Sequence, residues 1–259
     1  MPPTEEELLQ ALETEAPPDP VPTPPAAPKR KDGKFSMWEF LSKVIGYGNC
    51  EIFGDTGSGK TKTCVQIALD CSSEGKKVLY VDTEGNLASE DIDIIKQSKI
   101  DYRCIADGKD LYRLKKDTII PYDLIIIDSA TLAITGTWAE QKSNEHGDTL
   151  QRFQGMMYKF MVECLTSKKH IVIITGQPTS TMMQSVPTIG PMGDKVNFMI
   201  KQIFYIRAPK DPNGFITSRT MVAWRCRSIR DDTIITKINT KQFGADLDKQ
   251  IMADLLKNL

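Results

Sequence analysis

The chain has 259 residues, of which 40% are apolar and 26% are charged, and its formal net charge is −1. This size and apolar content allow one large hydrophobic core, and no apolar stretch reaches the length of a membrane-spanning helix. Six cysteines without a C-x-x-C pair and only two histidines argue against a zinc site. They favour buried free thiols in a reducing cytosol.

The first 34 residues form a tail that contains nine of the fifteen prolines. Because such a composition cannot build a packed core, we expect a disordered acidic tail at 1–34 and one folded domain at 35–259. Residues 1–28 hold six acids and no Lys or Arg, which leaves the rest of the chain mildly basic. A capping-box pattern at Thr4 and Glu7 opens a short leucine-bearing segment that is a candidate for docking on a protein partner, although a solvated tail is the plainer interpretation. No apolar signal core precedes it, so no export is predicted.

A phosphate-binding loop follows the first predicted strand. Residues 54–61 read GDTGSGKT and match the pattern G-x-x-x-x-G-K-[ST]. A helix near 37–44 and a strand at 50–53 precede the loop, and a helix over 61–73 follows it, which is the context that phosphate binding requires. Lys60 would reach the β- and γ-phosphates, and the Thr61 hydroxyl would bind Mg²⁺. The predicted phosphate-binding residues are Gly54, Asp55, Thr56, Gly57, Ser58, Gly59, Lys60, Thr61 and Lys62.

Three further apolar strands deliver polar residues to the same sheet edge. The strand at 77–82 continues into Thr-Glu-Gly, which places Glu84 where it could orient the water that attacks the γ-phosphate. The strand at 123–128 ends in Asp128, a second Mg²⁺ ligand, and the strand at 171–175 leads to Gln177. Ligands gather at the carboxyl ends of parallel strands, so the sequence predicts one nucleotide site.

Each of these polar residues also has a plainer interpretation. Asp82 is expected to be a structural residue at a strand end, Gln177 could cap a loop, and Asp128 alone would be an ordinary strand terminator. Their order along the chain is what favours a nucleotide site over these separate roles.

The remaining predicted elements complete an alternating pattern. A strand at 102–105 and a helix at 110–118 precede the strand of Asp128, and strands at 202–207, 220–227 and 233–238 come after Gln177. Near the end, apolar residues recur at helical spacing: Leu247, Ile251, Leu255 and Leu259. The pattern predicts an α/β fold with a mostly parallel central sheet, flanking helices and antiparallel C-terminal strands.

Two long predicted loops, 130–148 and 178–197, follow the strands of Asp128 and Gln177. Loops of this length usually have a function or are disordered. Their charge is weak, but the second loop is rich in methionine, which adapts to irregular surfaces such as bases or another protein. Contact with single-stranded DNA and simple flexibility until assembly both remain open.

The strand predicted at 220–227 ends in Arg225-Cys226-Arg227. Planar guanidinium groups suit a γ-phosphate that a neighbouring subunit presents, so both arginines are candidate arginine fingers. A basic strand with side chains that simply point to solvent is the alternative.

Taken together, these motifs resemble the RecA superfamily, which includes the RecA and RadA recombinases, the KaiC-like ATPases and the hexameric helicases. The resemblance spans residues 40–238 and is carried by the phosphate loop, the Glu84 and Asp128 segments and Thr175-Gly176-Gln177 as a γ-phosphate sensor. The Arg225-Cys226-Arg227 segment is similar to the Lys-x-Arg segment of the KaiC-like and helicase members. The resemblance implies ATP and Mg²⁺ as ligands, a ring or filament of identical subunits with ATP between them, and often DNA in its centre.

The chain departs from the recombinases in three respects. Asp91 stands where an archaeal recombinase would have an adenine-stacking arginine, and the nearest counterpart of the Phe-x-x-Ala polymerisation motif, Phe35-Ser36-Met37-Trp38, ends in tryptophan. The tail leaves no room for a helix-hairpin-helix domain. A full strand-exchange recombinase is therefore not expected.

Two functional classes fit this sequence. The first is a DNA-dependent ATPase of recombination, annealing or repair, similar to the archaeal RadB-type paralogues and small phage recombination ATPases. The second is a KaiC-like regulatory ATPase whose nucleotide state switches the binding of a protein partner. Stimulation of ATP hydrolysis by DNA would distinguish them.

Overall fold

The computed structural model describes residues 36–46, 48–85, 87–105, 121–130, 146–167, 171–176, 199–200, 202–227 and 229–238. Several predicted features lie outside these residues: the tail at 1–34, the helix at 110–118, Gln177, the loop at 178–197 and the apolar face from Leu247 to Leu259. Among the described residues, no helix is long and apolar enough to cross a bilayer.

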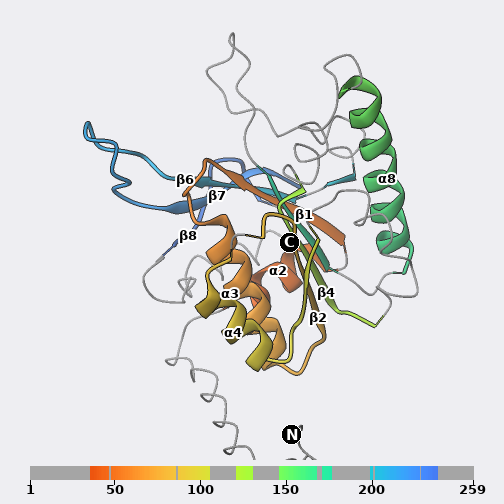
Figure 1. Ribbon diagram of the computed structural model, residues 1–259. Helices are drawn as coiled ribbons and strands as arrows, with labels where there is room; N and C mark the ends of the chain where they lie inside the picture. The colour runs from red at the N-terminus through yellow and green to blue at the C-terminus, as the bar shows by residue number, and fades with distance from the viewer. Residues whose placement is uncertain are drawn as a thin grey trace, which may run out of the picture.

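One eight-stranded sheet, in the order β3-β2-β4-β5-β1-β6-β7-β8, forms the centre of the described fold (Figure 1). In chain order the strands are β1 (Gly48–Gly54), β2 (Val78–Asp82), β3 (Asp101–Cys104), β4 (Leu124–Asp128), β5 (Ile171–Gly176), β6 (Gln202–Arg207), β7 (Thr220–Cys226) and β8 (Ile234–Lys237). The first six strands in this sheet order run parallel to one another, whereas β7 is antiparallel to β6 and β8 is antiparallel to β7. The mostly parallel α/β sheet with antiparallel C-terminal strands is therefore confirmed.

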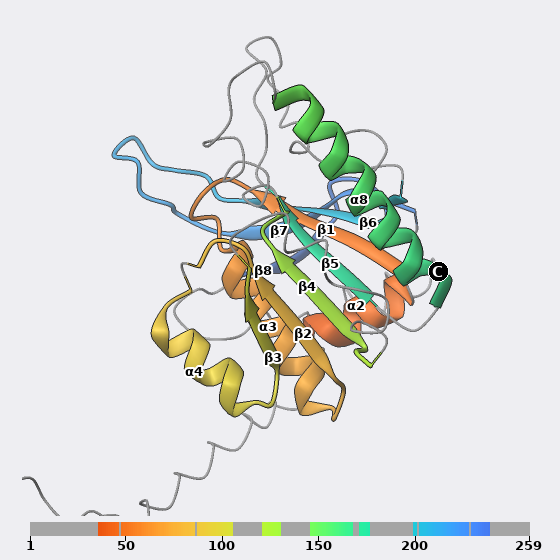
Figure 2. The ribbon, with the colours of Figure 1, turned by 45° about the vertical axis from the view of Figure 1, so that its right-hand side comes forward.

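Helices cover both faces of this sheet, as Figure 2 shows. On one face lie α2 (Met37–Ile45), α3 (Lys60–Ser73) and α4 (Ser89–Gln97), and on the other lies α8 (His146–Ser167). All residues of β2 and β4 are buried because both faces are covered, which explains their nearly continuous apolar sequences.

Two separate apolar clusters fill the spaces between the sheet and the helices. The larger one lies beneath α2, α3 and α4 and includes the fully buried Phe40, Ile67 and Ile95. The smaller one lies beneath α8 and joins Met157 and Met161 to Phe53 and Ile127. Since β1 contributes to both clusters, the strand that leads into the phosphate loop is held from both sides.

Two of these helices were not predicted from the sequence. Helix α4 buries only Asp91 and Ile95 completely, so its apolar stripe is too short to give a clear helical period. Helix α8 begins at His146, so the end of the predicted loop at 130–148 is helical, which corrects that boundary. Of the described α8 side chains, Met157 and Met161 are buried and lie one helical turn apart. Their packing against the sheet identifies the buried face of α8, which its composition did not indicate.

Candidate nucleotide-binding site

The phosphate loop joins the end of β1 to the start of α3. Gly57 and Gly59 have φ angles of +78° and +101°, a left-handed conformation that side chains rarely adopt. At Gly54, a Cβ atom would lie 2.7 Å from Ser58 Oγ and 2.9 Å from the carbonyl oxygen of Ile206. Glycine is required there because β6 approaches the loop backbone closely.

Lys60 points back into this loop. Its Nζ donates hydrogen bonds to the carbonyl oxygens of Gly54 at 2.8 Å and Asp55 at 3.0 Å, and the residue is only 7% exposed. Burial lowers the pKa of Lys60, while the negative charges of Asp128 and Glu84 oppose that shift. The loop therefore encloses a cation within electrostatic range of two carboxylates.

Asp128, at the end of β4, accepts hydrogen bonds from two hydroxyl groups. Thr175 donates to Oδ1 at 2.5 Å and Tyr80 donates to Oδ2 at 2.8 Å, and the nearby Thr61 hydroxyl of α3 also acts to lower the pKa of Asp128. Burial raises the pKa of Asp128, and these hydrogen bonds oppose the shift. The structure thus brings together the two predicted Mg²⁺ ligands, Thr61 and Asp128.

Glu84 follows β2 in a turn that backbone hydrogen bonds to Asp82 hold in place. Asp82, which precedes it by two residues, accepts hydrogen bonds from the backbone N–H groups of Glu84 and Gly85, both at 2.9 Å. The Glu84 side chain is half-buried, and its charge acts on both Lys60 and Asp128. The predicted catalytic glutamate therefore lies at the same sheet edge as the phosphate loop.

These residues fit a nucleoside triphosphate with Mg²⁺. Among the described residues, the buried Ser58 hydroxyl has no hydrogen-bond partner. In the same part of the chain, the buried Lys60 Nζ donates only to backbone carbonyl oxygens. A phosphate group would satisfy both. Thr61 lies close enough to Asp128 to act on its pKa, and a hydroxyl paired with a carboxylate is an oxygen donor set that Mg²⁺ accepts.

Lys62 has a different environment from the rest of the predicted loop. Its Nζ lies 2.6 Å from both carboxylate oxygens of Asp91, the residue that stands at the base-stacking position of the recombinases. Asp91 is 3% exposed. The pair links α3 to α4, and the predicted part of Lys62 in phosphate binding stays a prediction.

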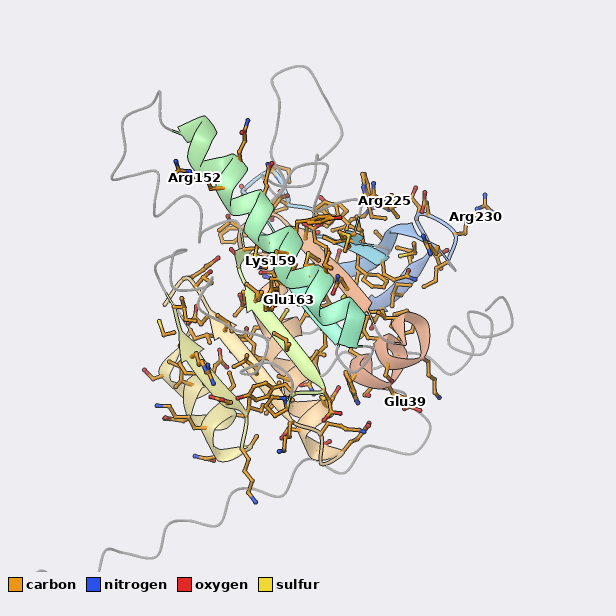
Figure 3. The ribbon with its side chains drawn as sticks, turned by 90° about the vertical axis from the view of Figure 1, so that its right-hand side faces the viewer. Glu39, Arg152, Lys159, Glu163, Arg225 and Arg230 are labelled. Atoms are coloured by element: carbon orange, nitrogen blue, oxygen red, sulfur yellow. The ribbon has the colours of Figure 1, made fainter. Side chains whose placement is uncertain are left out.

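The candidate finger residues lie far from the phosphate loop of their own chain. Arg225 pairs with Ile203, and Ile203 with Glu51 of β1, whereas Gly54 pairs with Ile206. This register places Arg225 about 10 Å along the strands and about 10 Å across them from Gly54. Arg227 follows the last residue of β7, Cys226, at the same far edge. Both side chains are exposed, and Figure 3 shows Arg225 at the β7 end of the sheet, away from Arg152 on α8.

Several contacts of this site were missed from the sequence. Tyr80 and Thr175 hold Asp128, and the guanidinium group of Arg219 lies 3.3 Å from the carbonyl oxygen of Gly57. Arg219 belongs to the β6–β7 connection, which projects at the left of Figure 1. A tyrosine inside an apolar strand was the available signal, since a buried phenol usually has a hydrogen-bond partner. Arg219 gave no such signal.

The sheet order, the phosphate loop after β1 and the acidic strand ends define a P-loop nucleotide-binding protein with a RecA-like fold. No family model matches the chain. It is 28% identical over 219 residues to the DNA repair and recombination protein RadB of Methanococcoides burtonii, which covers 78% of this chain and 93% of that protein. It is also 28% identical over 194 residues to the RadB protein of Thermoplasma acidophilum, with 70% of this chain and 78% of that protein covered.

A solved structure supports the same fold. The crystal structure of the RadB recombinase matches with a TM-score of 0.56 and 21% identity, over 78% of this chain and 94% of that one. The resemblance to RadB-type members of the RecA superfamily that the motifs indicated is confirmed by these matches.

Proposed function

We propose that this chain is a RecA-like ATPase that binds ATP with Mg²⁺ and acts in DNA recombination, annealing or repair. The observation that carries the proposal is the convergence of the phosphate loop, Glu84 and Asp128 at one sheet edge, with Lys60 in electrostatic range of both acids. The RadB relatives are named for DNA repair and recombination, which favours this class over the KaiC-like alternative.

In this proposal the loop amides and Lys60 bind the phosphates, and Thr61 and Asp128 hold the metal. When bound, Mg²⁺ neutralises negative charge on the phosphate oxygens. Tyr80 and Thr175 keep the Asp128 carboxylate oriented, since each donates a hydrogen bond to a different oxygen. Glu84 orients the attacking water and accepts its proton.

Gln177 is the proposed sensor of the γ-phosphate. The residue lies outside the described part of the chain, but Gly176, which precedes it, pairs with Phe53 next to the start of the phosphate loop. Its side chain can donate and accept hydrogen bonds, so loss of one phosphate would change its partners. Gln177→Ala is expected to bind ATP and lose DNA- or partner-stimulated turnover.

Arg225 and Arg227 are proposed to act on the nucleotide of a neighbouring subunit. Their distance from the phosphate loop of their own chain supports action in trans, because an arginine side chain cannot span that gap. A finger supplied in trans raises phosphoryl-transfer rates by several orders of magnitude. The proposal thus requires a homo-oligomer with ATP between subunits.

The loops predicted after Asp128 and Gln177, the first now ending before His146 and the second at 178–197, are proposed to contact single-stranded DNA, and the acidic tail is a candidate site for a protein partner. We further propose a cytoplasmic location, which the free thiols of Cys50, Cys64 and Cys71 support.

The decisive experiment measures ATP turnover with and without single-stranded DNA over a salt series, together with the mass of the protein in ATP. Stimulation that weakens with salt supports the DNA-dependent class. Unchanged turnover, with no DNA binding at low salt, would favour the KaiC-like class. Lys60→Ala should lose productive ATP binding, whereas Glu84→Gln should bind ATP and lose turnover about 100-fold or more.

A further inference from the structure

The turn that carries Glu84 is closed by the carboxylate of Asp82. Asp82 is the last residue of β2 and is 2% exposed. Its Oδ1 atom accepts hydrogen bonds from the N–H groups of Glu84 and Gly85, both at 2.9 Å. Bonds to a charged acceptor are stronger than bonds to a neutral one, so this carboxylate fixes the backbone from which the Glu84 side chain projects.

Tyr102 of β3 braces the other oxygen of this carboxylate. Its hydroxyl group donates to Asp82 Oδ2 at 2.9 Å, and the N–H of Ile105 donates to the Asp82 carbonyl at 2.8 Å. Burial and the hydrogen bond to Asp82 raise the pKa of Tyr102, so the phenol remains a donor at neutral pH. The backbone and the side chain of Asp82 are thus both held by the neighbouring strand.

The opposite side of the turn is attached to β4. Thr83 donates its N–H to the Asp128 carbonyl at 2.8 Å and its hydroxyl to the Ser129 carbonyl at 2.5 Å. Gly85 ends the turn with a φ angle of +63°. Fixed contacts to β3 and β4 therefore flank Glu84, whose charge acts on Lys60 and Asp128 across the site.

We propose that Asp82 and Tyr102 are positioning residues that set the direction of the Glu84 carboxylate toward the attacking water. This inference rests on the proposed role of Glu84. The two Asp82 oxygens accept three hydrogen bonds within the protein, two of them from the turn of Glu84, so the residue is assigned a role that acts through Glu84. A misplacement of about 1 Å in a catalytic group is enough to slow a reaction about 100-fold.

The test compares Asp82→Ala and Tyr102→Phe in the full-length protein, under the conditions that give the highest wild-type turnover. Asp82→Ala is expected to lower kcat about 10- to 100-fold and Tyr102→Phe about 3- to 10-fold. The Kd of a fluorescent ATP analogue should change less than about threefold in both, because neither residue binds phosphate. Tyr122→Phe is the matched control, since it removes another phenol–carboxylate bond, to Asp101, the first residue of β3, and should leave kcat unchanged.

A double-mutant cycle separates positioning from a general structural effect. In a Glu84→Gln background, measured in single-turnover reactions, neither substitution should lower the residual rate further. An additional loss there, or a wild-type kcat in both single variants, overturns the inference. Tyr102→Phe decides the matter if Asp82→Ala does not fold.

The inference and the proposed function fail in different ways. Wild-type turnover of Glu84→Gln alone would refute the role of Glu84 and this inference with it. Lost turnover in Glu84→Gln combined with normal turnover in Asp82→Ala and Tyr102→Phe would refute only the positioning role.

Discussion

Two buried carboxyl groups in the same sheet, Asp128 on β4 and Glu51 on β1, have opposite surroundings. One strand, β5, lies between them. Asp128 is 4% exposed and accepts hydrogen bonds from the hydroxyl groups of Tyr80 and Thr175. Glu51 is 0% exposed, and its register neighbours on either side are Ile174 and Ile203. Within the part of the chain that the structure describes, neither of its carboxyl oxygens has a hydrogen-bond partner.

The difference shows what determines the charge of a buried acid. Burial raises the pKa of both groups, but hydrogen-bond donors oppose that shift at Asp128. Burial raises the pKa of Glu51 to about 8, and only the charge of Arg225 is identified as opposing it. Hydrogen bonds therefore favour the charged form of Asp128 at its strand end, which suits its proposed role as a metal ligand, whereas Glu51, in the middle of a strand, is a mostly neutral acid at pH 7.

The largest expected effect separates the two acids by their role in turnover. Asp128→Asn should lower kcat about 100-fold or more and raise the Mg²⁺ concentration required, because the metal loses a charged ligand. Glu51→Gln should stay within about twofold of wild type, since it resembles the protonated acid. An ATPase assay titrated with Mg²⁺ measures both. Equal losses in the two variants would contradict the distinction.

The second prediction concerns the sheet edge opposite the phosphate loop. Arg225 lies there in register with Glu51, because both residues pair with Ile203 of β6. Mixed Lys60→Ala and Arg227→Ala subunits should recover about a quarter of wild-type turnover, because about a quarter of the shared sites would be intact after random assembly.

The control for this experiment is a mixture of Lys60→Ala subunits and Glu84→Gln subunits. Both of these residues belong to the same side of the shared site, so no intact site can form and no rescue is expected. Failure of the first mixture to recover activity, or full activity of a monomer, would exclude the shared site.

The third prediction is a pH dependence of stability. Glu51 has a folded pKa of about 8 against an ordinary value of 4.5, so the folded state holds the proton more tightly than the unfolded chain. The stability from this group is fully present below pH 4.5, decreases as the pH rises, and is lost once the pH has passed 8. In chemical denaturation at pH 8.5, Glu51→Gln should be more stable than wild type by about 1–3 kcal/mol, and the gap should shrink at pH 5.

Glu39→Gln is the matched control for that measurement. Glu39 forms a surface ion pair with Lys43 at 3.0 Å, one helical turn away, and such pairs contribute little. A difference from wild type that does not change with pH in Glu51→Gln would mean that Glu51 is not the titrating group.

The smallest expected effect comes from one of the hydroxyl groups that hold Asp128. Thr175→Val keeps the side-chain shape and removes the donor to Oδ1, so the Mg²⁺ concentration at half-maximal turnover should rise about 3- to 10-fold. Thr236→Val on β8 is a control with a similarly buried threonine distant from the site. An unchanged Mg²⁺ requirement in Thr175→Val would show that this hydrogen bond does not orient the ligand.

Much of the site could be predicted from the sequence because its signals are local. The phosphate loop is a contiguous motif, and Asp128 ends an uninterrupted apolar strand. Strands of that kind are typical of parallel sheets, whose carboxyl ends share one edge, so the convergence of the loop, Glu84 and Asp128 followed from strand type alone. The helices α4 and α8 were not predicted, and few of their described side chains are buried.

The amino-acid sequence alone specifies the chemical groups of the candidate nucleotide site: the glycines and Lys60 of the loop and the acids at two strand ends. The surroundings of these groups depend on the fold, because their partners lie far apart in the chain. Tyr80 and Thr175 reach Asp128 across 48 and 47 residues, and Tyr102 reaches Asp82 across 20. The order and direction of the strands set these contacts. The same order leaves Glu51 without a donor, and the reversed direction of β7 carries Arg225 to the far edge.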